Sequence, residues 1–136
     1  MSVGFRTGNF HYIVGTSAFL HAFFSTVSGR LEPAGWGSRF PALLGELYDG
    51  TLPAAHVVQA RDELRTIAAE LATLPPSAVI WDLENPAARP PWGDAISTDT
   101  THLANYFVTA DGRDLIWLLG ECLDAALEDG ADVTIE

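Results

Sequence analysis

The sequence predicts an α+β fold, in which a small mixed sheet of about four strands packs with three to five helices. Alternating apolar residues flank a turn at the N-terminus, which predicts a β-hairpin. Several longer stretches repeat apolar residues every three or four positions, and two short β-prone runs follow later in the chain. The 136 residues have the length of about one domain, so we expect a single domain over residues 1–136.

The first 31 residues predict a hairpin followed by an amphipathic helix. Residues 3–6 and 10–14 flank Thr7-Gly8-Asn9, and the alternation places Phe10, Tyr12 and Val14 on one face of the hairpin. Thr16 or Ser17 can cap the helix that follows. Its apolar stripe is Leu20, Phe23, Phe24, Val27 and Leu31, which leaves His21, Ser25 and Ser28 on the opposite side.

Two further helices are expected before residue 77. Ser38 offers a cap for a helix over residues 40–48, whose apolar stripe ends at Tyr48 because Asp49-Gly50 is a stop signal. A longer helix is expected to begin near Pro53, since proline suits a first helical turn, and to end before Pro75-Pro76.

The second half of the chain predicts a strand, a long loop, two helices and a closing strand. Residues 78–82 are β-prone and bounded by proline, and residues 83–99 show no period. A short helix is expected from Asp99 or Thr100 through Tyr106, and a final helix from Thr109 or Asp111 to Gly130. Residues 131–135 then form a strand. If this strand–helix–strand unit is parallel, its crossover is right-handed.

Two loops combine tryptophan, glycine and proline. The first spans residues 32–41 around Trp36, and the second spans residues 89–94 around Trp92. Such segments hold an indole at a fixed angle, so each ring either packs over the domain's own core or contacts a partner. Trp81 and Trp117 lie among aliphatic residues inside expected regular elements, where we predict a core role.

The charge is strongly acidic and unevenly distributed. The formal net charge is −11, and residues 82–136 hold twelve acidic residues against Arg89 and Arg113. Such a charge repels nucleic acid and anionic lipid and would steer a basic protein partner, although it can also serve solubility alone.

Targeting signals and cysteine pairs are absent from the sequence. Since it shows neither a secretory signal nor the ~20-residue apolar run of a membrane span, we expect a cytoplasmic protein. The lone Cys122 excludes an intrachain disulfide and is expected to be a buried thiol.

Acidic residues gather along one strand end and its loop, at Asp82, Glu84, Asp94 and Asp99. Asp82 and Glu84 would point the same way in a strand, and paired carboxylates either bind a divalent ion, carry out acid/base chemistry or form a solvated rim that meets a basic partner. Arg39 is expected to pair internally with Asp82 or Asp94.

The sequence gives little support for nucleophilic catalysis, for a histidine-based metal site or for a cofactor. Ser17 lacks the glycine-flanked turn of a nucleophile elbow, and the four histidines lack metal-ligand spacing. A glycine-rich phosphate loop is also absent. We therefore expect a protein that is not an enzyme.

The sequence resembles the bacterial immunity protein 70 family, the antidotes of polymorphic toxin systems. The resemblance is carried by residues 3–5, 31–41, 80–84, 90–94 and 105–112 and runs nearly from end to end. It implies a small α+β protein that binds and neutralises a cognate toxin. The acidic charge of the chain fits a toxin that is a basic nuclease. From the residues themselves, the toxin-binding candidates are Trp36, Arg39, Asp82, Glu84, Trp92, Asp94 and Asp99.

Two other functions stay open at this stage. One is an enzyme that uses Asp82, Glu84 and Asp94 with a histidine, and the other is a small adaptor or self-associating module that uses the two tryptophan loops. An adjacent toxin gene favours the antidote, a deep pocket over the carboxylates favours the enzyme, and a concentration-dependent mass favours the adaptor.

Overall fold

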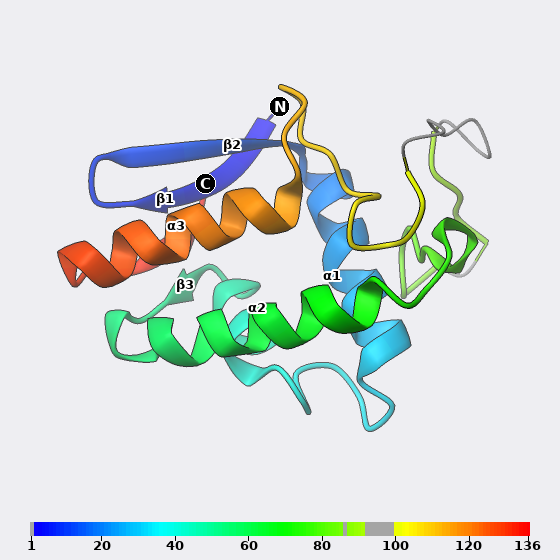
Figure 1. The fold of residues 1–136 in the computed structure, drawn as a ribbon, viewed down its shortest axis with the longest axis horizontal. Coiled ribbons are helices and arrows are strands. Elements are labelled where there is room, and N and C mark those ends of the chain that lie inside the picture. Colours follow the sequence, from blue (N-terminus) through cyan, green and yellow to red (C-terminus); the bar gives the residue numbers. More distant parts are fainter. Residues whose placement is uncertain (1, 86, 92–99) are drawn as a thin grey trace.

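The computed structural model describes residues 2–85, 87–91 and 100–136 (Figure 1). In these residues, four strands accompany three α-helices, one π-helix and short 3-10 turns. In chain order they are β1 (Ser2–Thr7), β2 (Phe10–Thr16), α1 (Ser17–Leu31), the π-helix η1 (Pro41–Leu47), β3 (Thr51–Leu52), the 3-10 turn η2 (Ala54–His56), α2 (Val57–Leu71), the 3-10 turn η3 (Pro76–Ala78), α3 (Leu115–Asp129) and β4 (Val133–Ile135).

The four strands form one sheet in the order β2-β1-β4-β3, which confirms the α+β class and the expected strand number. Every pairing is antiparallel, so the expectation of a mixed sheet is wrong. The reason is that β4 inserts between β1 and β3, with Phe5 opposite Ile135 and Leu52 opposite Val133. The first and last strands of the chain are therefore hydrogen-bonded neighbours in the sheet.

The N-terminal hairpin has the predicted position and one irregularity. Phe5 lies opposite Tyr12, and the register shifts between Val3 and Gly4. A Cβ atom on Gly4 would come within 2.2 Å of the Tyr12 carbonyl oxygen, so only glycine allows this close approach of the two strands.

The first and last helices begin and end through local caps. The Thr16 hydroxyl accepts a hydrogen bond from the Phe19 amide at 3.1 Å, as expected for the start of α1. Helix α3 begins later than expected, at Leu115, because Asp114 is the residue that caps it. Thr109 instead forms a turn by bonding Asp111. Gly130, in the left-handed conformation at φ 62°, ends α3 as predicted.

The helix expected over residues 40–48 is a short π-helix over Pro41–Leu47. Its first amides are bound by a side chain of another helix, because the Glu63 carboxylate of α2 accepts hydrogen bonds from the amides of Ala42 and Leu43 at 3.2 and 2.9 Å. Glu63 is only 8% exposed, so this contact fixes α2 against the start of η1.

The predicted strand over residues 78–82 does not form. Its backbone groups bond to the side chains of α1: the Thr26 hydroxyl donates to the Ile80 carbonyl and accepts from the Ile80 amide, both at 3.0 Å, and the Ser25 hydroxyl accepts from the Leu83 amide. These hydroxyls satisfy the groups that a sheet ladder would otherwise need. The segment therefore lies along α1.

The short helix expected up to Tyr106 is also wrong where the structure describes it. Residues 102–106 form turns, in which the Asn105 side chain accepts from the amides of Thr101 and His102. A local side-chain acceptor of this kind competes with the helical ladder.

The core lies between the sheet and the helices (Figure 1). Helix α3 packs on β1 and β2, α2 packs on α3 and η1, and α1 crosses behind them. The largest fully buried aromatic side chains are Phe5, Phe23, Phe24, Phe40 and Phe107. None of the helices in the described ranges has the length and apolar character needed to cross a membrane.

Candidate functional site

The first tryptophan loop is held in place by one buried carboxylate. Glu32, which follows the last residue of α1, is 3% exposed and accepts hydrogen bonds from the amides of Gly37, Arg39 and Phe40 at 2.9–3.0 Å. Gly37 has φ 78°, a backbone conformation that favours glycine. The loop around Trp36 is thus organised from inside the protein and not from its surface.

Trp36 combines an internal anchor with an exposed ring. Its indole nitrogen donates to the Leu44 carbonyl at 2.7 Å, and its ring lies 4.9 Å from the ring of Tyr48. The residue is nevertheless 38% exposed. One side of the indole therefore packs on the domain, as one of the two interpretations of the sequence requires, and the other side is exposed to solvent; contact with a partner stays a prediction.

A cluster of polar side chains lies beside Trp36 and joins three distant parts of the chain. The His21 ring stacks on that of Trp36, with 6.3 Å between their centroids. Its Nδ1 lies 2.7 Å from the Tyr48 hydroxyl, and its Nε2 lies 3.1 Å from Asp82 Oδ1. A neutral ring with its proton on Nε2 satisfies both contacts, because the phenol then donates to Nδ1 while Nε2 donates to the carboxylate.

The electrostatics of this cluster favour an ionised carboxylate and a protonated phenol. The hydrogen bond from His21 holds the pKa of Asp82 below its ordinary value, assisted by the Glu84 amide. Burial raises the pKa of Tyr48, and the charges of Glu84, Asp82 and Asp49 raise it further. A nucleophile or general base would need the opposite shift, so the hydroxyl is suited to hydrogen bonding.

A pocket of about 480 Å³ opens beside the cluster. Helix α1 and the ends of β1 and β4 supply its apolar wall, which consists of Val3, Leu20, Phe24 and Ile135. His21, Tyr48 and Asp82 line its polar side together with Ser17. The volume lies within the range of about 300–1,000 Å³ that is usual for ligand-binding clefts.

A model of the family described as Immunity protein 70 matches residues 5–135 of the chain. The chain belongs to this family. No curated protein and no solved structure matches it. The family name implies an immunity protein, which agrees with the resemblance noted from the sequence. The matched range contains every polar residue of the cluster and pocket.

Among the candidate residues of this Immunity protein 70 member, the structure brings Trp36, Asp82 and Glu84 to one area. Asp82 accepts a hydrogen bond from the backbone amide of Glu84 at 3.0 Å, and Glu84 is exposed. Trp92, Asp94 and Asp99 lie outside the described residues, and their roles stay predictions.

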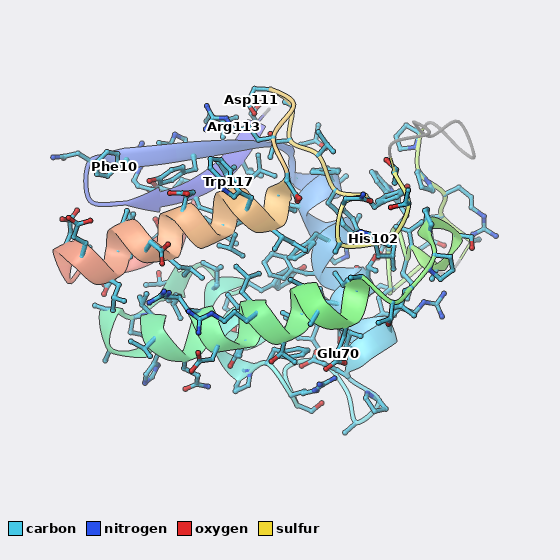
Figure 2. All side chains as sticks on the ribbon, viewed as in Figure 1. Phe10, Glu70, His102, Asp111, Arg113 and Trp117 are labelled. Atoms are coloured by element: carbon cyan, nitrogen blue, oxygen red, sulfur yellow. The ribbon has the colours of Figure 1, made fainter. Side chains whose placement is uncertain are left out.

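Arg39 pairs with a carboxylate as predicted, but the partner that the structure describes is neither Asp82 nor Asp94. Arg39 pairs with Glu70 at the end of α2, and its guanidinium also donates to the Leu31 carbonyl at 3.2 Å (Figure 2 labels Glu70). Asp82 is instead occupied by His21. The reason is the path of the loop, which runs back from Trp36 toward α2 and carries Arg39 away from residues 80–84.

Two tryptophans predicted to be internal differ in this Immunity protein 70 structure. Trp81 is partly buried against the core, in line with the prediction. Trp117 is 54% exposed, and Figure 2 shows it on the side of α3 toward β2. The core prediction for Trp117 is wrong because the buried stripe of α3 runs through Leu115, Leu118 and Leu119.

Sequence reasoning missed His21 and Tyr48 as site residues. The sequence pattern places His21 on the polar side of its helix and makes Tyr48 the last residue of an apolar stripe. The available signal was that each carries a polar group at the edge of an apolar stripe, where a side chain can reach both the core and solvent.

Proposed function

We propose that this protein neutralises a cognate bacterial toxin by direct protein–protein contact in the cytoplasm, and that it does so without enzymatic activity. The observation that carries the proposal is the half-exposed indole of Trp36 beside the carboxylates of Asp82 and Glu84. Membership of the Immunity protein 70 family supports the class of function. We name the surface formed by Trp36, Tyr48, Asp82 and Glu84 the aromatic–acidic surface.

The aromatic–acidic surface has the physical properties of a binding hot spot. Tryptophan is enriched among residues that dominate interface energies, and Trp36 is held by its bond to Leu44 and by the Glu32 network. An anchor that is already fixed loses little conformational entropy when a partner covers it. Burial of its exposed side therefore converts efficiently into affinity.

Charge supports a basic toxin as the partner. The chain carries a formal net charge of −11, and the carboxylates of Asp49, Asp82 and Glu84 are all close enough to raise the pKa of Tyr48. A basic toxin would be steered toward such a surface, and its association rate would fall as salt screens the interaction. The nuclease class fits this charge, because nucleases bind a polyanion.

The same geometry supports a role other than catalysis. Both nitrogens of His21 are already engaged, one by Tyr48 and one by Asp82, and the phenol is shifted toward its protonated form. An enzyme built on the carboxylates would need one of these groups to be poised for proton transfer.

The test is co-expression with the protein encoded by the gene immediately upstream, scored by rescue of growth and by the affinity of the purified pair. Glu84→Lys and Trp36→Ala are the test variants. Glu128→Lys and Trp117→Ala are their matched controls, because Glu128 and Trp117 are exposed on α3. We expect each test variant to weaken binding at least tenfold, and each control to bind within about threefold of wild type.

Two outcomes would contradict the proposal. If wild type neither binds nor rescues, and its mass rises with concentration, the chain is an adaptor or self-associating module. If wild type rescues but the test variants match their controls, the toxin binds a different surface. Melting temperatures of all four variants show whether any loss of binding comes from unfolding.

A further inference from the structure

The lining of the pocket beside His21 combines apolar and polar side chains. Val3, Leu20, Phe24 and Ile135 supply the apolar part, and Asp82 adds a carboxylate. No lysine or arginine lines the pocket in the described part of the chain. A ligand that suits both kinds of lining has an aliphatic stem and a positively charged end.

The polar side has hydrogen-bond acceptors left over. Asp82 Oδ1 receives the bonds from His21 Nε2 and from the Glu84 amide, and the Asn85 amide also acts on this carboxylate; a carboxylate has about four lone-pair sites, so Oδ2 keeps room to accept from a ligand. With His21 neutral and its proton on Nε2, the Tyr48 hydroxyl donates to Nδ1 and keeps lone pairs for a further donor. Both groups therefore face a ligand as acceptors, which suits a cation that carries several N–H groups.

The local field favours a cation over an anion. Asp82 is stabilised in its charged form, and the charges of Glu84, Asp82 and Asp49 act together on the Tyr48 hydroxyl. The pocket also contacts the first residues of α1, whose free amides carry a partial positive charge. That partial charge is about half a unit and is outweighed by the carboxylates nearby.

We infer that this pocket receives an arginine side chain of the toxin, an assignment that rests on the proposed function. The methylene stem would lie along Leu20 and Phe24, and the guanidinium would donate to Asp82 Oδ2 and the Tyr48 oxygen. Guanidinium fits better than the ammonium of lysine, because it is planar, offers donors in a fork and is more weakly hydrated. The aromatic ring of Tyr48, which lines the pocket, also favours it, since arginine stacks on such faces.

The first test uses the purified protein and small probes in place of the toxin. n-Butylguanidinium carries the stem and charge of arginine, and n-butylurea has nearly the same shape without charge. We expect n-butylguanidinium to cause saturable NMR shifts at the His21 and Tyr48 side chains, and n-butylurea to bind at least tenfold more weakly. Equal binding of the two probes, no saturable shift, or tighter binding of n-butylammonium would overturn the assignment of arginine.

Variants locate the probe in this pocket. Asp82→Asn removes the charge with little change of shape and is expected to weaken n-butylguanidinium binding at least tenfold. Ala18→Met keeps the charge but fills space, because Ala18 lines the pocket, and is expected to abolish saturable binding. Glu128→Gln on α3 is the control and is expected to bind like wild type. Unchanged binding by the Asp82 and Ala18 variants would place the probe elsewhere.

The second test uses the toxin and separates this inference from the proposed function. Each surface arginine of the toxin is changed to alanine and combined with Asp82→Asn in a double-mutant cycle. One arginine should lose at least tenfold in affinity with wild type but less than threefold with Asp82→Asn. A toxin that binds tightly with no arginine coupled to Asp82 would overturn the inference and leave the function intact, whereas probe binding without any toxin binding would contradict the proposed function and leave a guanidinium-binding pocket whose ligand is not the toxin.

Discussion

Removal of the Glu32 carboxylate should destabilise the domain strongly. Glu32 is 3% exposed, and its two oxygens divide the three backbone donors unequally. Oε1 accepts from the Gly37 amide at 3.0 Å, whereas Oε2 accepts from the amides of Arg39 and Phe40 at 3.0 and 2.9 Å. The side chain therefore replaces the backbone partners that the loop does not have.

The size of the effect follows from this count of bonds. A hydrogen bond to a charged group contributes about 1.5–3 kcal/mol, so three bonds set an upper limit of about 5–9 kcal/mol. Water can reach part of the loop in a truncated variant, and we expect Glu32→Ala to cost about 3–5 kcal/mol of unfolding free energy. Glu32→Gln can keep the two bonds at Oε2 if its carbonyl lies there, and loses only the bond from Gly37, at about 1–3 kcal/mol.

Urea unfolding followed by far-UV circular dichroism measures these differences. Glu128→Gln is the matched control, because it makes the same chemical change at an exposed residue of α3, and it should stay within about 0.5 kcal/mol of wild type. The reasoning is refuted if Glu32→Ala stays within about 1 kcal/mol of wild type, or if Glu32→Gln is as damaging as Glu32→Ala.

Three other predictions concern single side chains. Burial raises the pKa of Cys122 to about 12, so its thiol should resist disulfide reagents at pH 8 in native protein and react rapidly in urea. The free energy of unfolding should also fall as pH rises from about 9, because only the thiol of the unfolded chain ionises there. The bond to Arg39 lowers the pKa of Glu70, so Glu70 should stabilise the fold at pH values above the ordinary carboxyl pKa and lose this effect in acid. Because both side chains of the pair are over a third exposed, Glu70→Gln should lower the free energy of unfolding by at most about 1 kcal/mol at pH 7 in urea titrations, and by less in high salt. Trp117→Ala should change the free energy of unfolding by under about 1 kcal/mol, whereas truncation of the buried Phe24 should cost about 3–5 kcal/mol. A large loss of stability in Trp117→Ala would show that the Trp117 ring is part of the core.

Local signals predicted the elements whose partners are close in sequence. The cap at Thr16, the apolar stripe of α1 and the stop at Gly130 all depend on residues within a few positions of one another. The strand expected over residues 78–82 failed for the opposite reason. Its backbone partners are the hydroxyls of Ser25 and Thr26, 54 to 58 residues away, and no local pattern distinguishes such partners from a neighbouring strand.

The sequence predicted some residues of the candidate site but not the contacts that join them. Trp36 and Asp82 could be selected by residue type and by their place in unusual segments. Their connection could not be predicted, because it passes through His21, which lies 27 residues from Tyr48 and 61 residues from Asp82. The partner of Arg39 was missed for the same reason, since the direction of a loop is fixed by tertiary contacts such as those of Glu32.

The acidic charge of the chain serves different purposes at different places. Glu32 and Glu63 bind backbone amides inside the domain, and five arginines are matched by carboxylates in the described residues, in the pairs Arg6–Glu136, Arg39–Glu70, Arg61–Asp124, Arg65–Asp62 and Arg113–Asp111. The charge that can act on a partner is therefore the excess of carboxylates that arginines do not match, and the carboxylates around Tyr48 contribute to it.

The unpaired charge and the local contacts act on different steps of binding. Steering depends on the summed field, so Glu84→Lys and Glu128→Lys, which each change the net charge of −11 by two units, should slow association at low salt to a similar extent, and the loss of a local contact at Glu84 should add to this effect. Under the proposed function, Trp36 and Asp82 would act only after contact, through a fixed ring and an acceptor beside a pocket, so their loss should mainly speed dissociation. A toxin with the right charge but without a side chain for the pocket would then meet this surface often and leave it quickly, which would make the antidote selective among basic toxins.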